Sequence, residues 1–305
     1  MAILASLLGG LRAQSPAAAW NVPDVDALQN GIWKTTVLRG RDLFNDTNRF
    51  IGPEAAARSS RYAGNNLSCQ NCHLDGGTRR FGLPIVGVYG LYPAFMAREN
   101  SVRTIEDRIN GCLERSMNGR AMPSDAMEMK ALVAYMQFLS TGASVGRPLD
   151  GRGTPALPLL TRAANPSRGR EVFVEQCAVC HQANGLGRRR GQPGDGSGYV
   201  YPPLWGPDSF NDGAGMHRLI ASAAFIRANM PFGARAETPS LSIEDAWDVA
   251  SFVNSQPRPA RLHLDRDYPD RTLKPMDAPF GPYADTFPPE QHRLGPFQLM
   301  LPVAR

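Results

Sequence analysis

The sequence contains little lysine and no nucleic-acid-binding module. Lys occurs only at positions 34, 130 and 274 among 33 basic residues, so Arg carries nearly all of the positive charge. Arg is always ionised and its planar fork suits oxyanions. With a net charge of +5, this composition indicates anionic ligands, acidic partners or simply a solvated basic surface, and we expect no nucleic-acid partner.

The sequence also lacks an apolar run at its start that is long enough to cross a bilayer. The run at residues 2–11 suits only the h-region of a signal peptide, and the alanines at 17–19 offer a cleavage site before Trp20. A basic n-region is missing, so the true start lies upstream or the run is an ordinary apolar arm. We predict a signal peptide at residues 1–19, export, and no stable membrane insertion.

Cysteines are few, and most of them belong to one pattern that occurs twice. Residues 69–73 read Cys-Gln-Asn-Cys-His and residues 177–181 read Cys-Ala-Val-Cys-His. In c-type haem attachment, two thiols with this spacing reach the vinyl groups of one porphyrin, and the adjacent His points at the iron. The predicted attachment residues are Cys69, Cys72 and His73, and Cys177, Cys180 and His181.

Zinc binding is the competing interpretation of a C-x-x-C pattern. Neither half has a further pair of cysteines to complete a four-thiolate zinc site. Four of the five cysteines belong to the two motifs, which leaves Cys112 alone. We therefore predict two covalently bound c-type haems. Bacteria attach c-type haem outside the cytoplasmic membrane, so we expect a periplasmic protein.

An internal repeat precedes each haem motif. Residues 40–44 read Gly-Arg-Asp-Leu-Phe and residues 169–173 read Gly-Arg-Glu-Val-Phe. A Gly/Pro-rich loop follows each motif, and apolar residues then recur with the helical period at residues 125–139 and 243–253. A first helix packed on a last helix with haem between them is the cytochrome c plan. The predicted fold is all-α, with two cytochrome c-like domains that each bind one haem.

The domain boundaries follow from Gly and Pro. Residues 141–158 are rich in both and lack periodicity, which is typical of a linker. After Pro257 the chain has repeated Pro with aromatics, which indicates an extended Pro-rich C-terminal arm wrapped over the domains. We predict a first domain at 20–145, a linker at 146–165, a second domain at 166–258, and an arm at 259–305.

The distal ligand of the second haem is predicted to be Met230. Residues 226–231 end a helical stretch with Asn229-Met230-Pro231, a common way to present a thioether to haem. A Met ligand raises the potential of the iron. The alternatives are a core Met and His217 as ligand.

Residues 104–123 stand where the distal ligand of the first haem should come from. Helical spacing puts Arg108, Cys112 and Ser116 on one face, four residues apart. A thiol beside Arg and facing ferric iron has a lowered pKa, so Cys112 is a candidate ligand. Met117 and Met122 are the alternatives, with Cys112 then buried and inert.

Several segments together resemble the di-haem thiosulfate dehydrogenases. They are residues 103–123 with their Arg-x-x-x-Cys-x-x-x-Ser pattern, the two haem motifs, the turn at 229–231 and the helix at 244–250. The resemblance implies that two thiosulfate anions are joined to tetrathionate while two electrons leave through the haems. It is equally compatible with the reverse reaction, tetrathionate reduction.

The resemblance also implies a role for each haem. In that family the first haem has His and Cys as axial ligands and is the active site, which maps onto His73 and Cys112. The second, with His181 and Met230, passes electrons to an external acceptor such as a small cytochrome c or a high-potential iron–sulfur protein. Some relatives carry a Lys before the distal Met and exchange ligands, whereas this chain has Asn229, so we expect no such exchange.

The proposed chemistry requires cations, because two dianions must approach each other. Arg108 and Ser116 flank Cys112, while Arg98 and Arg103 precede it and are predicted to close the pocket. Cys112 is also a candidate for a covalent bond to the sulfane sulfur of one thiosulfate.

Four other charged or titratable residues are predicted to be ordinary surface groups: Arg115, Arg120, His263 and His292. Two further functions stay open on the sequence alone. One is a di-haem electron carrier without its own substrate, with Met117 or Met122 in place of Cys112. The other is a haem subunit of a sulfur-oxidising complex, which also uses a Cys-ligated haem.

Overall fold

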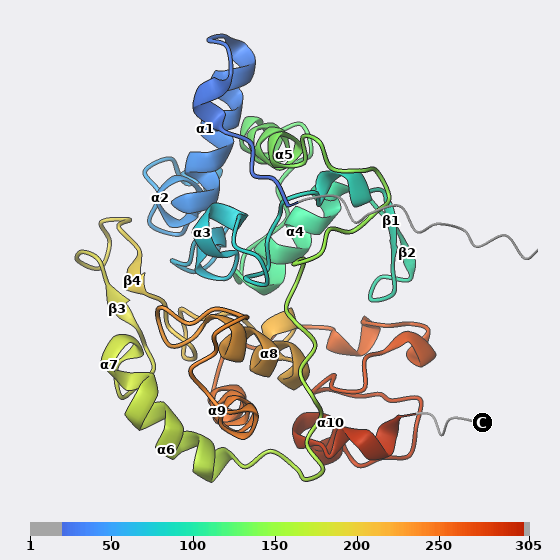
Figure 1. Ribbon diagram of the computed structural model, residues 1–305. Helices are drawn as coiled ribbons and strands as arrows, with labels where there is room; N and C mark the ends of the chain where they lie inside the picture. The colour runs from blue at the N-terminus through green and yellow to red at the C-terminus, as the bar shows by residue number, and fades with distance from the viewer. Residues whose placement is uncertain (1–19, 302–305) are drawn as a thin grey trace, which may run out of the picture.

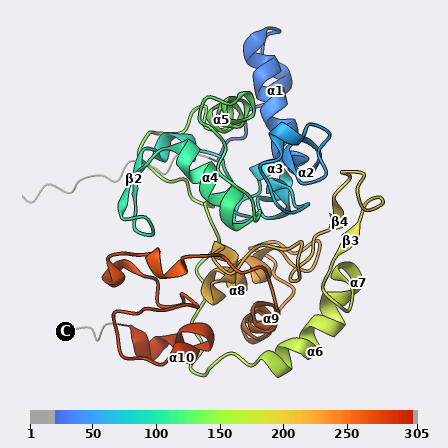
Figure 2. The same cartoon turned by 180° about the vertical axis from the view of Figure 1, so that it is seen from behind.

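The computed structural model describes residues 20–301, so the predicted signal peptide lies outside the described residues. Figures 1 and 2 show two groups of helices, with the last part of the chain packed along the second group. The helices are α1 (Ile32–Asn45), α2 (Thr47–Ile51), α3 (Leu74–Gly77), α4 (Ile105–Arg115), α5 (Met127–Leu139), α6 (Pro166–Gln176), α7 (Ala178–His181), α8 (Leu219–Asn229), α9 (Ile243–Ser255) and α10 (Pro289–Leu294). No helix within residues 20–301 has the length and apolarity needed to span a membrane.

Strands are confined to two short antiparallel pairs. β1 (Ala94–Met96) pairs with β2 (Ser101–Arg103), with Ala94 opposite Arg103. β3 (Arg188–Arg189) pairs with β4 (Tyr199–Tyr201), with Arg188 opposite Tyr201. The prediction of a helical fold is therefore confirmed, with two hairpins that the sequence analysis did not predict.

The internal repeat marks the closest approach of two helices in each half. A Cβ on Gly40 of α1 would lie 1.9 Å from the carbonyl oxygen of Ala131 on α5. A Cβ on Gly169 of α6 would lie 1.9 Å from the carbonyl oxygen of Asp248 on α9. Since such distances leave no space for a side chain, only glycine permits these crossings. The repeat therefore specifies how the first helix of each half packs on the last.

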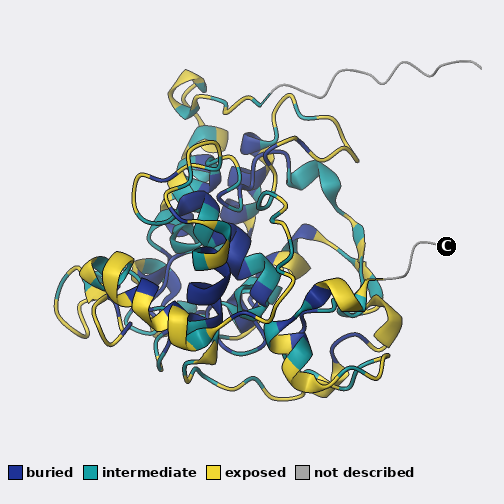
Figure 3. Ribbon diagram, turned by 60° about the horizontal axis from the view of Figure 1, so that its bottom comes forward, coloured by how far each residue is buried: buried dark blue, intermediate teal, exposed yellow. Residues whose placement is uncertain are grey.

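Each half has its own apolar core beside this crossing. Phe44 and Phe173, which end the two repeat copies, are both buried. The Phe44 ring centroid lies 5.8 Å from that of His73, and the Phe173 centroid lies 5.0 Å from that of Trp205. Figure 3 shows the buried residues gathered on the inner helices and the exposed ones on the outer faces and loops.

Helix α4 begins at a capping box. The Thr104 hydroxyl accepts a hydrogen bond from the Asp107 backbone N–H (3.3 Å), and the Asp107 carboxylate accepts one from the Thr104 N–H (3.0 Å). Ile109 and Leu113 form part of its buried face, and Ser116 is its C-cap. The helix predicted within residues 104–123 is thus observed, with the cap fixing the direction in which α4 leaves the β1–β2 hairpin.

Polar contacts join the two halves. Arg189 of β3 reaches back to Glu54 in the first half, with an Nη1–Oε1 distance of 3.1 Å. The Asn229 amide nitrogen, at the end of α8, donates to the Phe81 carbonyl oxygen (3.1 Å). This contact joins the loop after the first haem motif, which contains Phe81, to the end of α8 just before the predicted ligand Met230.

The C-terminal arm wraps over both halves, as predicted, but it is more helical than predicted. It contains α10 and several 3₁₀ turns. Phe297 packs on Trp247 of α9 with ring centroids 5.8 Å apart, and Asp277 pairs with Arg218 at 2.6 Å. Pro289 at the start of α10 suits a helix N-terminus, but the segment is too short to produce a recognisable helical period.

Two predictions of surface location are wrong, and the arm is the reason for both. Arg115 is buried and forms a two-pronged ion pair with Asp267 of the arm (2.7 and 2.8 Å). His292 is buried within the arm itself, against the Met276 carbonyl oxygen and Asp285. Arg120 and His263 are exposed, as predicted.

Candidate functional site

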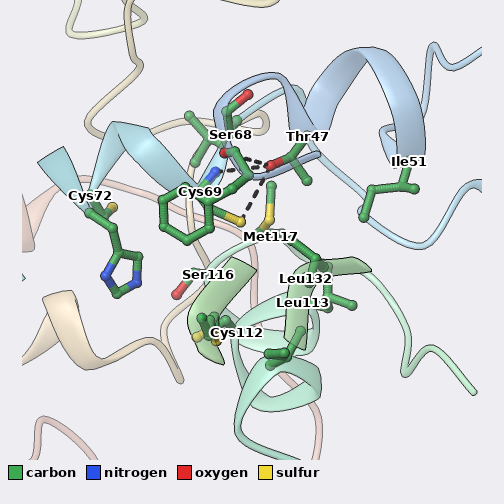
Figure 4. Close-up of a pocket in the computed structure, with 15 residues that line it drawn as sticks. Thr47, Ile51, Ser68, Cys69, Cys72, Cys112, Leu113, Ser116, Met117 and Leu132 are labelled. Atoms are coloured by element: carbon green, nitrogen blue, oxygen red, sulfur yellow. Dashed lines mark hydrogen bonds between the residues drawn. The ribbon is translucent and has the colours of Figure 1, made fainter. Parts of the chain in front are cut away.

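A cavity in the first half is lined by both the first haem motif and α4. Figure 4 shows Cys69 and Cys72 on one side and Cys112 and Ser116 of α4 on the other. The remaining lining residues are mostly apolar: Phe44, Thr47, Ile51, Leu67, Ser68, Ile109, Leu113, Met117, Leu132 and Met136. His73 also lines the cavity. Two thiols and an imidazole within apolar walls fit a covalently held porphyrin.

The ring of His73 is oriented by the backbone. Its Nδ1 lies 2.5 Å from the carbonyl oxygen of Leu83, which directly precedes Pro84. When Nδ1–H donates to this carbonyl, the lone pair of Nε2 remains available for iron. The hydrogen bond therefore selects the tautomer and the orientation that a proximal ligand requires.

Thr47 fixes the first attachment thiol. Its hydroxyl lies 3.3 Å from Cys69 Sγ and accepts the Cys69 backbone N–H at 3.1 Å. Burial raises the pKa of Cys69 to about 12 and the pKa of Cys72 to about 11. Both cysteines are thus neutral thiols before attachment and suit a structural role.

Cys112 is the exception among the thiols of the cavity. Burial alone would raise its pKa, but the Arg108 guanidinium, the neighbouring His73 and the charge of Arg98 together lower the pKa of Cys112 to about 6. Arg108 Nη1 lies 3.3 Å from Cys112 Sγ. The i,i+4 spacing predicted from the sequence therefore places a cation beside the sulfur of a half-buried cysteine, which favours the thiolate near neutral pH.

The structure separates the other predicted pocket residues. Ser116 lines the cavity one turn beyond Cys112. Arg98 is close enough for its charge to act on Cys112. Arg103 instead lies 3.7 Å from Asp107 in a half-exposed i,i+4 ion pair. Of the predicted Arg residues, Arg98 and Arg108 are therefore brought to the site, whereas Arg103 is directed to a surface pair.

The two methionine alternatives for the first haem differ in position. Met117 lines the cavity and is buried. Met122 is buried in the core of the first half and is not among the cavity-lining residues. Since Cys112 also lines the cavity and its sulfur has the Arg108 guanidinium 3.3 Å away, which favours the thiolate, the arrangement favours Cys112 over both.

The second haem motif has the same backbone support as the first. His181 is buried, and its Nδ1 lies 2.8 Å from the carbonyl oxygen of Pro202, which precedes Pro203. Burial raises the pKa of Cys177 to about 11. The donor set again fits a covalent haem, because Nε2 of His181 is left for iron.

The candidates for the distal side of the second haem are clearly different. Met230 is the C-cap of α8, and its N–H bonds the Ile226 carbonyl oxygen at 2.8 Å. His217 has Nδ1 2.8 Å from the Asp212 carbonyl oxygen and Nε2 3.3 Å from that of Asn254. Both nitrogens of His217 therefore face backbone oxygens, which favours Met230. The pairing of His181 with Met230 stays a prediction.

Two family models match the chain. One, described as the cytochrome c domain of SoxA/TsdA, matches residues 59–145, and the other, cytochrome c, matches residues 166–257. A thiosulfate dehydrogenase from Stutzerimonas stutzeri is 42% identical over 73% of this chain and 67% of its own length. One from Allochromatium vinosum is 41% identical over 81% of this chain and 87% of its own length. The chain belongs to the thiosulfate dehydrogenase family.

A solved structure agrees with this membership. The thiosulfate dehydrogenase TsdBA from Marichromatium purpuratum, in its as-isolated form, superposes with a TM-score of 0.71 at 37% identity, over 79% of this chain. The present chain covers half of that longer chain. Two cytochrome c domains in a member of this family confirm two covalently bound c-type haems, one for each motif.

The sequence analysis did not predict Tyr92 as part of the site around Cys112. Tyr92, just before β1, lies beside Arg108 and Cys112, and burial raises the pKa of its phenol while Arg108 opposes that rise. A protonated phenol can donate a hydrogen bond to an anion. No sequence pattern indicates it, because it precedes Cys112 by 20 positions and the β1–β2 hairpin lies between them.

Proposed function

We propose that this protein joins two thiosulfate anions to tetrathionate at the first haem site and passes two electrons through both haems to an external acceptor. Family membership supports the reaction class. The observation that carries the proposal is the 3.3 Å contact between Arg108 Nη1 and the sulfur of Cys112, a residue that lines the haem-motif cavity. An electron carrier has no need of a thiolate paired with a cation beside its haem.

Each haem has a proposed set of residues. Cys69 and Cys72 would hold the first haem covalently, with His73 and Cys112 as its axial ligands. His181 and Met230 would ligate the second, attached through Cys177 and Cys180. When bound, the two haems supply one-electron acceptors, so a two-electron oxidation can be divided between them.

Positive charge is what the protein itself contributes to substrate binding. Arg108 lies at the solvent-facing side of Cys112, and Arg98 acts on the same sulfur. Arg forks match sulfur oxyanions, and fixed cations offset the repulsion between two dianions. The Ser116 hydroxyl, on the cavity wall, adds a donor or acceptor. We propose Arg98, Arg108 and Ser116 as the substrate contacts, with Arg103 outside this set.

We propose that Cys112 also reacts covalently. The Cys112 thiolate and the sulfane sulfur of one thiosulfate form an S–S bond, and this step releases two electrons to the haems. A second thiosulfate attacks the sulfane sulfur, its own sulfane sulfur forms the central bond of tetrathionate, and the Cys112 thiolate leaves. No proton is required, and a thiolate is both the nucleophile and the leaving group.

Met230 would be the residue that makes the second haem the exit for electrons. A methionine ligand raises the potential of a haem iron, so a Met-ligated second haem would supply the acceptor for electrons from the first. We propose a small cytochrome c or a high-potential iron–sulfur protein as the acceptor, and the periplasm as the location, since c-type haem is attached there. The relative potentials of the two haems and the acceptor decide whether the reaction runs forward or as tetrathionate reduction.

The test is a steady-state assay of the purified holoprotein with thiosulfate and ferricyanide. We expect one ferricyanide reduced for each thiosulfate consumed, with tetrathionate as the product. The haem content is checked by a pyridine haemochrome assay after acid–acetone extraction, which removes non-covalent haem. A protein that retains both haems but reduces no ferricyanide with thiosulfate, and oxidises no reduced dye with tetrathionate, would be an electron carrier.

A further inference from the structure

Arg98 is held from outside its own half of the molecule. Its Nη1 donates to the carbonyl oxygen of Gly213 (3.2 Å), and its Nε lies 3.4 Å from the phenol oxygen of Tyr268 in the C-terminal arm. Its guanidinium also lies 5.7 Å from the Tyr268 ring centroid. The Tyr268 N–H returns a backbone hydrogen bond to the Arg98 carbonyl oxygen (2.8 Å). Arg98 is thus fixed at both its backbone and its side chain.

The residue before Tyr268 anchors the arm to α4. Asp267 is buried and gives one carboxylate oxygen to each of two nitrogens of Arg115, at 2.7 and 2.8 Å. Arg115 follows Cys112 on α4 by three residues, and its Nη1 shares the Gly213 carbonyl oxygen with Arg98 (3.3 Å). The arm, α4 and Arg98 therefore form one connected network. Figures 1 and 2 show this part of the arm, in orange, beside the β1–β2 hairpin in both views.

The positive charge of Arg98 is not neutralised within this network. Both oxygens of Asp267 are taken by Arg115, and the closest approach of Asp267 to Arg98 is 4.0 Å, beyond hydrogen-bond distance. The contacts of Arg98 use Nε and Nη1, and Nη2 has no hydrogen-bond partner among residues 20–301. The single carboxylate of Asp267 therefore balances only one of the two guanidinium groups, and Nη2 of Arg98 can donate a hydrogen bond to an anion.

The backbone of Tyr268 carries a conformational cost. Its φ is +59°, in the left-handed region that a bulky side chain rarely adopts. Such a conformation persists when surrounding contacts hold it, and it gathers at functional sites. Tyr268 is also buried. We therefore interpret the conformation of Tyr268 as serving its contacts with Arg98 rather than only continuing the arm.

We propose that Asp267 and Tyr268 of the C-terminal arm are positioning residues that hold Arg98 for the sulfur oxyanion at Cys112. This inference rests on the proposed function and extends it to a part of the chain that carries no haem ligand. A free arginine side chain loses much rotamer freedom when it binds an anion, and a side chain that is already ordered does not. The arm therefore increases the affinity for the dianion.

The main test variant is Tyr268→Phe, which removes one oxygen and keeps the ring. We expect KM for thiosulfate to rise by about three- to tenfold with kcat nearly unchanged, because a single hydrogen bond to Arg98 is lost before the chemical step. Sulfate, a dianion that the enzyme does not oxidise, serves as a binding probe by calorimetry on the oxidised holoprotein. Its Kd should rise by a similar factor. Asp267→Asn should act in the same direction, although it also weakens a buried pair.

The decisive measurement is a double-mutant cycle. In the Arg98→Ala background, Tyr268→Phe should change neither KM nor the sulfate Kd, because Tyr268 acts only through Arg98. The control is Tyr283→Phe, which removes a phenol from the same arm that donates a hydrogen bond to the Ala278 carbonyl oxygen (3.2 Å) and not to Arg98. It should leave KM and the sulfate Kd as in the wild type.

The outcomes separate this inference from the proposed function. Loss of sulfate affinity in Tyr268→Phe that disappears in the Arg98→Ala background supports the positioning role, even if no thiosulfate is oxidised, in which case the proposed function alone fails. If thiosulfate is oxidised and Tyr268→Phe has no effect, or the same effect in both backgrounds, the positioning role is overturned. It is also overturned if the wild type binds no sulfate.

Discussion

The two halves share a frame and differ in what lies on the distal side. In both, a glycine lets the first helix cross the last, and a carbonyl before a proline orients the haem-motif His. The proposed distal ligands differ: in the first half it is Cys112, with Arg108 and Arg98 near it, and in the second it is Met230 at the end of α8. Under the proposed function, this common frame holds haem, and the distal segment decides between substrate chemistry and electron transfer.

The distal segments also differ in polarity. Helix α4 carries charged residues beside its thiol and opens towards solvent at Arg108. Helix α8 is apolar, with Leu219, Ala223 and Phe225 buried. An apolar surrounding and a neutral ligand stabilise the ferrous state, while a thiolate with cations suits an anionic substrate. The predictions below break or sharpen this difference, beginning with the largest effect.

Replacing Cys112 should have the largest effect, because it removes the thiolate that distinguishes the first half from the second. We expect Cys112→Ala to abolish thiosulfate turnover and to leave both haems attached, because the thioether bonds come from other cysteines. Low-temperature EPR of the oxidised protein should lose the low-spin signal typical of His/thiolate ligation. An unchanged EPR spectrum in the variant would instead favour a Met ligand and an electron carrier.

Removing the cation beside the thiolate should have the next largest effect. Arg108→Ala removes a charge-assisted hydrogen bond between the guanidinium and the bound thiosulfate. This loss costs about 1.5–3 kcal/mol, or roughly ten- to a hundredfold in kcat/KM. Steady-state kinetics with thiosulfate and ferricyanide measures this. The matched control is Arg120→Ala, an exposed arginine just beyond α4 that stacks on Tyr62. Equal losses in the two variants would indicate a general effect of surface charge rather than a pocket contact.

The sequence predicted those features that depend on neighbours along the chain. The haem motifs, the glycine repeat and the Arg108–Cys112 pair are local, because attachment geometry and helical periodicity fix which residues meet. The surroundings of Arg98 were not predictable in this way. Arg115 and Asp267 are 152 positions apart, and their pairing depends on how the arm folds back over α4. Tyr92 was missed for the same reason.

Replacing the second distal ligand should affect only the exit of electrons. Met230→Ala should lower the potential of the second haem, because a neutral sulfur ligand no longer favours ferrous iron. We expect slower steady-state transfer to a small cytochrome c, with a smaller loss than in Arg108→Ala. Rapid mixing with thiosulfate should still reduce the first haem in a single turnover. If Met230→Ala stops that reduction while Cys112→Ala does not, the active site belongs to the second haem.

The smallest expected effect concerns His217, which was the competing ligand in the second half. Burial and the nearby Arg258 lower the pKa of His217, and both of its ring nitrogens face backbone oxygens. Below the ordinary His value of about 6.5, the unfolded chain therefore takes up a proton that the folded protein resists. The unfolded state then binds more protons, so stability is retained above that pH and is lost as the pH falls through the lowered folded pKa.

The variant His217→Gln should reduce this loss of stability at acidic pH. The measurement is the urea midpoint by circular dichroism between neutral and mildly acidic pH, and the visible spectrum of the second haem should stay unchanged. His263→Asn, at an exposed position, is the control and should keep the wild-type slope. A changed haem spectrum in His217→Gln would mean that His217, not Met230, is the distal ligand.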